Sequence, residues 1–197
     1  PFFGNKIMNI MLITMSIIQT PIIFGFITAV MINTQATNVE TLGQALALLS
    51  AGACLGLGSI GPAYGQSIYA RSACQTLGNN RNTYRSILTF SLISQAMIES
   101  PIIFALLTSL LILGITTATI SPMQSLLTVV AGLCVGITNI APGISSGRTA
   151  AEAAKQITYN LSHYAIITRT SLIAQGLIDT FAIYGLLIAL LLLLFIK

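Results

Sequence analysis

Two carboxylates, Glu99 and Asp179, each lie in the middle of a long apolar stretch. In a stretch that crosses a membrane, an ionised side chain costs roughly 2.5–3.5 kcal/mol on insertion scales. A proton, a bound cation or an arginine partner can offset that cost, and burial away from water favours the protonated acid. Because the two carboxylates recur in the same register, they are better candidates for reversible ion binding than for protonated packing residues.

Oxygen-bearing side chains accompany Glu99. Ser100 follows it, Gln95 lies one helical turn before it, and Gln66 lies on the preceding apolar stretch. In an antiparallel hairpin that turns near residues 78–83, Gln66 and Glu99 each lie about 15 residues from the turn, roughly 22 Å at 1.5 Å per residue. Carboxylate, amide, hydroxyl and carbonyl oxygens suit a small hard cation. With one negative charge, Na⁺ fits better than a divalent ion.

The equivalent set around Asp179 is smaller. Thr180 keeps the hydroxyl and Gln175 keeps the amide, but Ser146 stands where the other set has Gln66. The Asp side chain is also one methylene shorter than Glu. We expect this site to bind Na⁺ with a water filling the gap, or to bind H⁺.

The elements that position these residues are membrane spans. The chain is 55% hydrophobic and 6% charged, whereas a soluble domain carries about 25% charged residues. Five stretches reach the roughly 20 apolar residues that a transmembrane helix needs. They are 6–33, 42–76, 84–115, 122–157 and 163–196. The sequence therefore predicts an all-α membrane protein of tandem transmembrane helical hairpins.

Basic residues set the orientation of these spans. Seven of them lie near the start of the chain or near the second and fourth breaks: Lys6, Arg71, Arg81, Arg85, Arg148, Lys155 and Arg169. By the positive-inside rule these breaks are cytoplasmic. The net charge of +4 therefore reports membrane topology, and we expect no nucleic-acid partner.

The chain contains an internal repeat that aligns without gaps. Gly52, Cys54, Gly56 and Pro62 align with Gly132, Cys134, Gly136 and Pro142, and Ser91, Gln95 and Glu99 align with Ser171, Gln175 and Asp179. The same shift, applied once more, places Gln19 at the carboxylate position of the first span. We divide the chain into 1–40, the second helix of a hairpin without a carboxylate; 41–120, a complete hairpin with Glu99; and 121–197, a complete hairpin with Asp179. Because Gln19 cannot usefully gain or lose a proton, we expect the first unit to be silent in transport.

Three features of the middle hairpin form a known pattern. They are the first helix with its small residues Gly52, Cys54 and Gly56, the run Gly61-Pro62-Ala63-Tyr64-Gly65-Gln66, and the run Ser94-Gln95-Ala96-Met97-Ile98-Glu99-Ser100. With them the chain resembles the c subunit, or proteolipid, of the rotor ring of rotary ATP synthases, in its sodium-binding F-type form. The resemblance implies that Glu99 is the ion carboxylate, with Gln66 and Ser100 as side-chain ligands and Met97 offering its carbonyl.

In the last hairpin the resemblance implies the same roles for Asp179, Thr180, Gln175 and Ser146. Tyr184 matches a family tyrosine that orients the carboxylate, and Phe104 replaces it in the middle hairpin. The family's Arg-Gln-Pro loop becomes Asn79-Asn80-Arg81 and Tyr159-Asn160-Leu161, so contacts with central-stalk subunits are expected to differ.

The resemblance also implies partners and a mode of action. The chain would be a non-catalytic, ion-translocating subunit without a cofactor, in a multi-pass ring of its own copies within a bacterial inner membrane. Its other partners would be a stator a subunit, the central-stalk subunits at the cytoplasmic loops, and lipids. The transported ion would be Na⁺ or H⁺. A ring with two carboxylates for every three hairpins would carry fewer ions per turn than a ring with one carboxylate in each hairpin.

Three alternatives remain open on the sequence. Fused hairpins that lose carboxylates also occur in the proteolipids of V-type and A-type ATPases. A secondary transporter would need inverted repeats, whereas a step of one repeat crosses the membrane twice and keeps the orientation. A purely structural membrane protein would not need the two carboxylates. By the register, Pro1 falls at the proline of the loop motif, so we expect an upstream helix that completes three hairpins and six helices.

Overall fold

Helices account for nearly all of the chain in the computed structural model, which describes residues 2–116 and 121–195. Within these residues, five helical spans are long and apolar enough to cross a membrane, with mean hydropathies from 1.6 to 2.5. They cover Gly4–Ala36, Leu42–Asn79, Arg81–Ile115, Pro122–Tyr159 and Leu161–Leu194. The predicted all-α membrane architecture is confirmed, and the predicted end of the last span at 196 lies outside the described residues.

Two of the five spans are interrupted near their centres, which the sequence analysis did not predict. The helices are α1 (Phe2–Ile18), α2 (Thr20–Ala36), α3 (Leu42–Asn79), α4 (Tyr84–Ile115), α5 (Pro122–Thr138), α6 (Ile140–Tyr159) and α7 (Tyr164–Leu194), with 3₁₀ turns η1 (Arg81–Thr83) and η2 (Leu161–His163).

A proline follows each interruption. Proline has no N–H to donate to the carbonyl four residues earlier. Pro21 follows the break at Gln19 between α1 and α2, and Pro142 follows the break at Asn139 between α5 and α6. By contrast, Pro62 and Pro101 lie inside the continuous helices α3 and α4. In a membrane such prolines are tolerated where neighbouring groups satisfy the freed carbonyl.

Hydrogen-bonded caps fix the helix starts at the end opposite the basic loops. Thr41 and Gln44 form a capping box at the start of α3, and Ser121 and Gln124 form the same motif at the start of α5. Each box satisfies backbone N–H groups that the first helical turn leaves free. The internal repeat therefore includes the N-terminal capping motif of the first helix in each complete hairpin.

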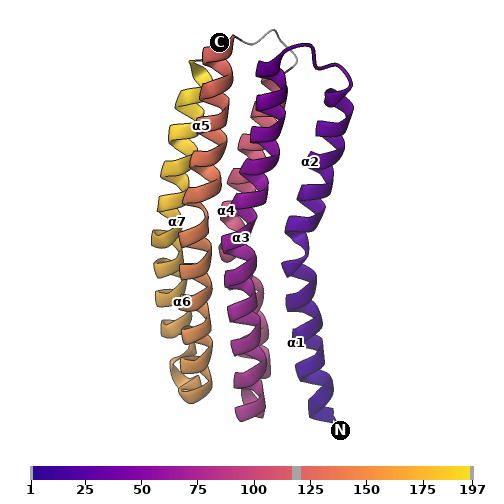
Figure 1. Cartoon of the computed structure of the whole chain (residues 1–197). Helices are drawn as coiled ribbons and strands as arrows, with labels where there is room; N and C mark the ends of the chain where they lie inside the picture. Colours follow the sequence, from indigo (N-terminus) through magenta and orange to yellow (C-terminus); the bar gives the residue numbers. More distant parts are fainter. Residues whose placement is uncertain (1, 117–120, 196–197) are drawn as a thin grey trace.

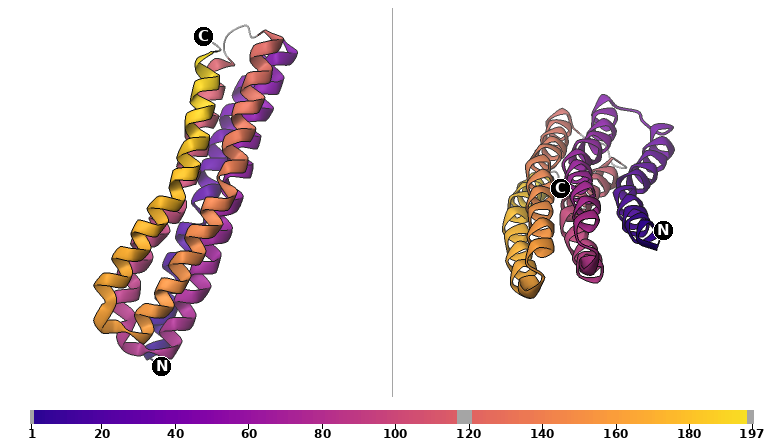
Figure 2. Two further views of the ribbon diagram at one scale, coloured as in Figure 1. Left: turned by 90° about the vertical axis from the view of Figure 1, so that its left-hand side faces the viewer. Right: turned by 90° about the horizontal axis from the view of Figure 1, so that it is seen from below.

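The helices form three units that lie side by side (Figure 1). The span α1–α2 packs against α3, and α3 packs against α4 on one side and against α5 and α6 on another. Figure 1 shows α4 and α7 behind α3 and α6, and the view from below in Figure 2 shows α3 between α1–α2 and α6. The N-terminus and the turns η1 and η2 gather at one end of the bundle. There the ammonium group of Lys6 lies 5.2 Å from the centre of the Tyr84 ring.

The contact between α3 and α6 joins one polypeptide backbone directly to another. A Cβ atom on Gly65 would overlap the carbonyl oxygen of Gly143, and one on Gly147 would overlap the backbone of Gly65. Ser72 adds a hydrogen bond of 2.9 Å to the carbonyl of Ala151. Since lipid tails satisfy apolar side chains as well as another helix does, close approach through small residues is how helices associate in a membrane.

Candidate ion-binding site

Asp179 lies buried where three helices meet. It is 5% exposed. Its Oδ2 accepts a hydrogen bond of 2.6 Å from the Ser100 hydroxyl on α4, and its Oδ1 accepts one of 3.2 Å from the Ser146 hydroxyl on α6. The site is thus shared between the middle hairpin and the last one. Hydrogen bonds to a charged group contribute about 1.5–3 kcal/mol each, so these two hydroxyls stabilise the ionised carboxylate.

A backbone carbonyl next to this carboxylate lacks its helical partner. Pro101 has no N–H, so it cannot bond to the carbonyl of Met97 one turn earlier. The Ser100 hydroxyl lies 2.9 Å from that carbonyl oxygen and also contacts Asp179. The freed carbonyl, the hydroxyl and the carboxylate therefore place three hard oxygen groups together, which is the ligand chemistry that a small cation prefers.

Gln175, one helical turn before Asp179, forms a second hydrogen-bonded contact between the same two hairpins. Its Nε2 lies 3.4 Å from the Ser94 hydroxyl on α4 and 3.1 Å from the Ser171 hydroxyl on its own helix. Its Oε1 is buried and has no hydrogen-bond partner among the described residues. The amide thus keeps one oxygen available for a further polar group.

The surroundings of Glu99 hold several polar atoms that are buried and unbonded. A Cβ on Gly65 would lie 3.3 Å from the Ile98 side chain, so Gln66 lies at the level of Glu99. Within the part of the chain that the structure describes, both side-chain polar atoms of Gln66 and of Gln95 lack hydrogen-bond partners, as does Oε1 of Glu99. Each such buried group costs about 1–3 kcal/mol. A bound cation would satisfy the oxygens among them.

Several predicted residues lie elsewhere than the sequence analysis placed them. We grouped Ser100 and Met97 with Glu99, but the structure brings them to Asp179. Thr180 donates to the carbonyl of Leu177 in its own helix, at 2.7 Å. Tyr184 is 59% exposed, and no hydrogen bond joins it to Asp179 in the described residues. The repeat register fixes depth along the helices, but it does not say which neighbouring hairpin a side chain faces.

Two contributors were not foreseen at all. Ser94 and Ser171 hold the Gln175 amide. The sequence held a signal for Ser171, since it repeats Ser91. In the structure the Ser91 hydroxyl lies 2.7 Å from that of Tyr69. No group of three or more His, Cys, Asp and Glu residues suited to a metal occurs among the described residues. Any cation here would be held by a single carboxylate and neutral oxygens.

A family model for the c subunit of ATP synthase matches residues 49–112 and again residues 129–192. The chain belongs to the ATP synthase c subunit family. The two matches have the same offset as the internal repeat, so the chain contains two c-subunit repeats. It is a multi-pass integral membrane protein, and the family distinguishes it from the secondary transporters considered above.

Individual relatives agree with the family match. Over 66 residues the chain is 41% identical to an ATP synthase c subunit from Dehalococcoides mccartyi, an alignment that covers 34% of this chain and 87% of the relative. Over 68 residues it is 38% identical to an ATP synthase c subunit from Geotalea uraniireducens, an alignment that covers 34% of this chain and 75% of the relative. Each relative thus corresponds to about one hairpin of this chain.

Proposed function

We propose that this chain is a rotor-ring subunit of a rotary ATP synthase and carries Na⁺ or H⁺ across the membrane on Glu99 and Asp179. The observation that carries the proposal is the buried Asp179 carboxylate, which accepts hydrogen bonds from Ser100 on one hairpin and Ser146 on the next. A carboxylate shared by two hairpins can bind an ion at their boundary. Its partners are copies of itself, a stator a subunit and central-stalk subunits at the basic loops.

The Glu99 site has the same construction by the repeat register. Its carboxylate and Gln66 come from the middle hairpin, as Asp179 and Ser146 come from the last. The preceding unit contributes Thr20 in the place of Ser100. It also contributes the carbonyl of Ile17, which Pro21 frees as Pro101 frees that of Met97. Each ion site therefore lies between neighbouring units of one chain.

Transport follows from the charge of these carboxylates. With an ion bound, a site is neutral and can face lipid while the ring turns, because an uncompensated charge there is costly. A cationic stator side chain would draw the carboxylate away and release the ion to the other side. A potential of 100 mV supplies about 2.3 kcal/mol for each charge that crosses. Gln19 carries no charge and takes no ion.

The ligands favour Na⁺ at Glu99 more than at Asp179. The unbonded Oε1 atoms of Gln66 and Gln95 are buried at the level of Glu99, and amide oxygens are good ligands for hard cations. Ser146 replaces Gln66 in the last hairpin and already bonds to Asp179. We therefore assign Na⁺ to Glu99, and Na⁺ with a water or H⁺ to Asp179.

Carbodiimide labelling tests the proposed function. A hydrophobic carbodiimide modifies protonated carboxyl groups in apolar surroundings, and mass spectrometry locates the adducts. We expect adducts at Glu99 and Asp179 but none at Glu152, which is exposed and paired with Lys155 at 2.6 Å. Na⁺ should suppress the Glu99 adduct in a sodium rotor, whereas only rising pH would suppress it in a proton rotor. Absence of adducts at both Glu99 and Asp179 would contradict ion transport by this chain.

A pair of hydroxyl variants tests which unit completes each site. Ser100→Ala removes the 2.6 Å bond to Asp179, so the Na⁺ concentration that protects Asp179 should rise about tenfold or more, given about 1.5–3 kcal/mol for such a bond. Protection of Glu99 should not change. The matched variant Thr20→Val should affect Glu99 and spare Asp179. Weaker protection of Glu99 by Ser100→Ala would show that the hydroxyl serves its own hairpin.

A further inference from the structure

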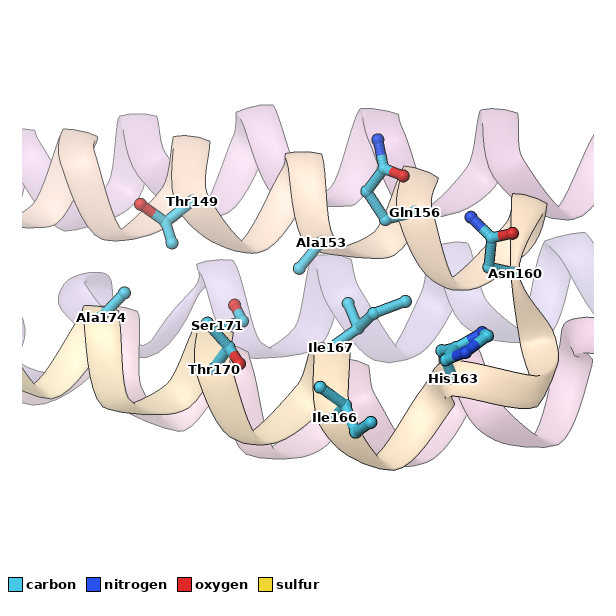
Figure 3. A pocket seen from close by; sticks show the side chains of 10 residues that line it. All are labelled: Thr149, Ala153, Gln156, Asn160, His163, Ile166, Ile167, Thr170, Ser171 and Ala174. Atoms are coloured by element: carbon cyan, nitrogen blue, oxygen red, sulfur yellow. The ribbon is translucent and has the colours of Figure 1, made fainter.

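The two helices of the last hairpin leave grooves between them. One groove, of about 570 Å³, lies toward η2, and its lining includes Thr149 on α6 and Ser171 and Ala174 on α7 (Figure 3). Another, of about 510 Å³, lies farther from η2, and its lining includes Pro142 and Ile178. Packing within the last hairpin is therefore incomplete on both sides of Asp179, and contacts with other helices gain weight in holding this carboxylate in place.

Asn139, at the break between α5 and α6, reaches across to α4. It is fully buried, and its Nδ2 donates a hydrogen bond of 2.6 Å to the carbonyl of Pro101. Pro101 directly follows Ser100, whose hydroxyl donates to Asp179. One amide of the last hairpin therefore holds the turn of α4 that supplies a hydroxyl to the ion carboxylate.

The turn that Asn139 holds has one backbone hydrogen bond fewer than an ordinary helical turn, because Pro101 cannot donate to the carbonyl of Met97. Helices bend most readily at such a proline. A binding site has to keep its groups within about 0.5 Å of their places. Asp179 is shorter than Glu by one methylene, so it has little reach to follow Ser100 if the turn moves. The bond from Asn139 gives this turn a fixed point from outside its own helix.

The backbone of Asn139 is in turn held by α3. A Cβ atom on Gly61 would overlap the backbone carbonyl of Asn139, and a Cβ atom on Gly58 would lie 3.3 Å from its Nδ2. The two glycines therefore let residue 139 lie directly against α3, at the point where its amide crosses to α4. This close contact leaves the amide little room to shift.

The middle hairpin has a serine at the equivalent position. Its Ser59 hydroxyl donates to the carbonyl of Gly56 in its own helix, at 2.8 Å. Asn139 is the more costly residue, since its Oδ1 is buried and has no hydrogen-bond partner among the described residues, and an unpaired buried acceptor destabilises a fold. Stability therefore gives little reason for an asparagine here, whereas its hold on the Ser100 turn does.

We propose that Asn139 is a positioning residue of the Asp179 site, whose amide holds the Pro101 carbonyl and thereby keeps Ser100 against Asp179. The inference rests on the proposed function. It gives Asp179 a support that the Glu99 site lacks, because Ser59 stands in the place of the amide there.

Asn139→Ser, which introduces the residue that the repeat already accommodates, tests the positioning role. Carbodiimide labelling is measured in the full chain in its membrane, at a pH and Na⁺ concentration that protect both carboxylates of the unmodified chain. Labelling of Asp179 should become about tenfold faster, because its unprotonated form loses the Ser100 hydroxyl. Labelling of Glu99 should not change and serves as the control for folding. Equal acceleration at both carboxylates, or none at Asp179, would overturn the proposal.

A double variant tests the route of the effect. If Asn139 acts through Ser100, then adding Asn139→Ser to Ser100→Ala should accelerate the labelling of Asp179 no further than Ser100→Ala does alone, because residues that act through one contact are not additive. Accelerations that multiply would show that Asn139 acts by another route and would overturn its role in positioning Ser100.

Disulfide formation tests the geometry independently of ion transport, in a background that replaces Cys54, Cys74 and Cys134 with alanine. Ser100→Cys with Asp179→Cys should oxidise to a link inside the chain, and Asn139→Ser should slow that reaction several-fold. The control pair, Ser72→Cys with Ala151→Cys across the α3–α6 contact, should link at an unchanged rate. A link between positions 100 and 179 that is not slowed would overturn the positioning role. A slowed link without carbodiimide adducts at either carboxylate of the unmodified chain would contradict the proposed function alone.

Discussion

The double variant Glu99→Gln with Asp179→Asn is expected to lower ATP-driven ion uptake into vesicles by the assembled complex to the background rate. An amide cannot alternate between a charged form near the stator and an ion-bound form in lipid. The membrane potential then acts on no charge, and the roughly 2.3 kcal/mol per charge per 100 mV is not coupled to rotation. Uptake of radioactive sodium, or quenching of a pH-sensitive dye, measures the loss in either ion regime.

The chain offers a matched control for that variant. Glu152→Gln makes the same chemical change at an exposed residue, whose carboxylate pairs with Lys155 on the same helix. Exposed ion pairs contribute about 0–1 kcal/mol, so uptake should stay near the unmodified rate. Uptake that survives in the double variant, or that fails equally in Glu152→Gln, would contradict the assignment of transport to Glu99 and Asp179.

Gly65→Ala is expected to destabilise the chain by about 1–3 kcal/mol, the usual cost of overpacking. The new methyl group would overlap the backbone of Gly143, and neither backbone has a side chain that can move aside. Gly56→Ala is the control on the same helix, since nothing lies within 4 Å of its Cβ position. There the gain in helix propensity should stabilise by about 0.5–1 kcal/mol.

Thermal denaturation of the purified protein in detergent measures both glycine variants. The midpoint should fall for Gly65→Ala and stay level or rise for Gly56→Ala. Equal shifts would mean that α3 and α6 are not in backbone contact at this level. Gly147→Ala, which would overlap Gly65 from the other side, should repeat the loss seen with Gly65→Ala.

The sequence predicted the spans because the apolar stretches are long and because the basic residues alternate between breaks. It predicted the two carboxylates because Glu99 and Asp179 recur in register. It did not predict that Ser100 faces Asp179 rather than Glu99, since a repeat gives the depth of a residue but not the neighbour that it meets. That choice depends on how the hairpins rotate against one another.

The helix breaks were a second omission. Pro21, Pro62, Pro101 and Pro142 all lie in the spans, yet only two of them accompany an interruption. The helices α3 and α4 pass through Pro62 and Pro101 without a break. The Ser100 oxygen lies 2.9 Å from the Met97 carbonyl that Pro101 frees, while its one hydrogen is donated to Asp179, and α4 stays continuous. A single sequence does not show which prolines its helices accommodate, because that depends on the tertiary surroundings of each proline.

The backbone contact between α3 and α6 has a mechanical consequence. Where side chains separate two helices, a twisting force can be absorbed by rotamer changes before the helix axes move. Gly65, Gly143 and Gly147 leave no side chain between the two helices, and close-packed interiors have low compressibility and transmit strain. A force applied to one hairpin should therefore reach the next with little lag, and the joined hairpins should turn as a stiff body.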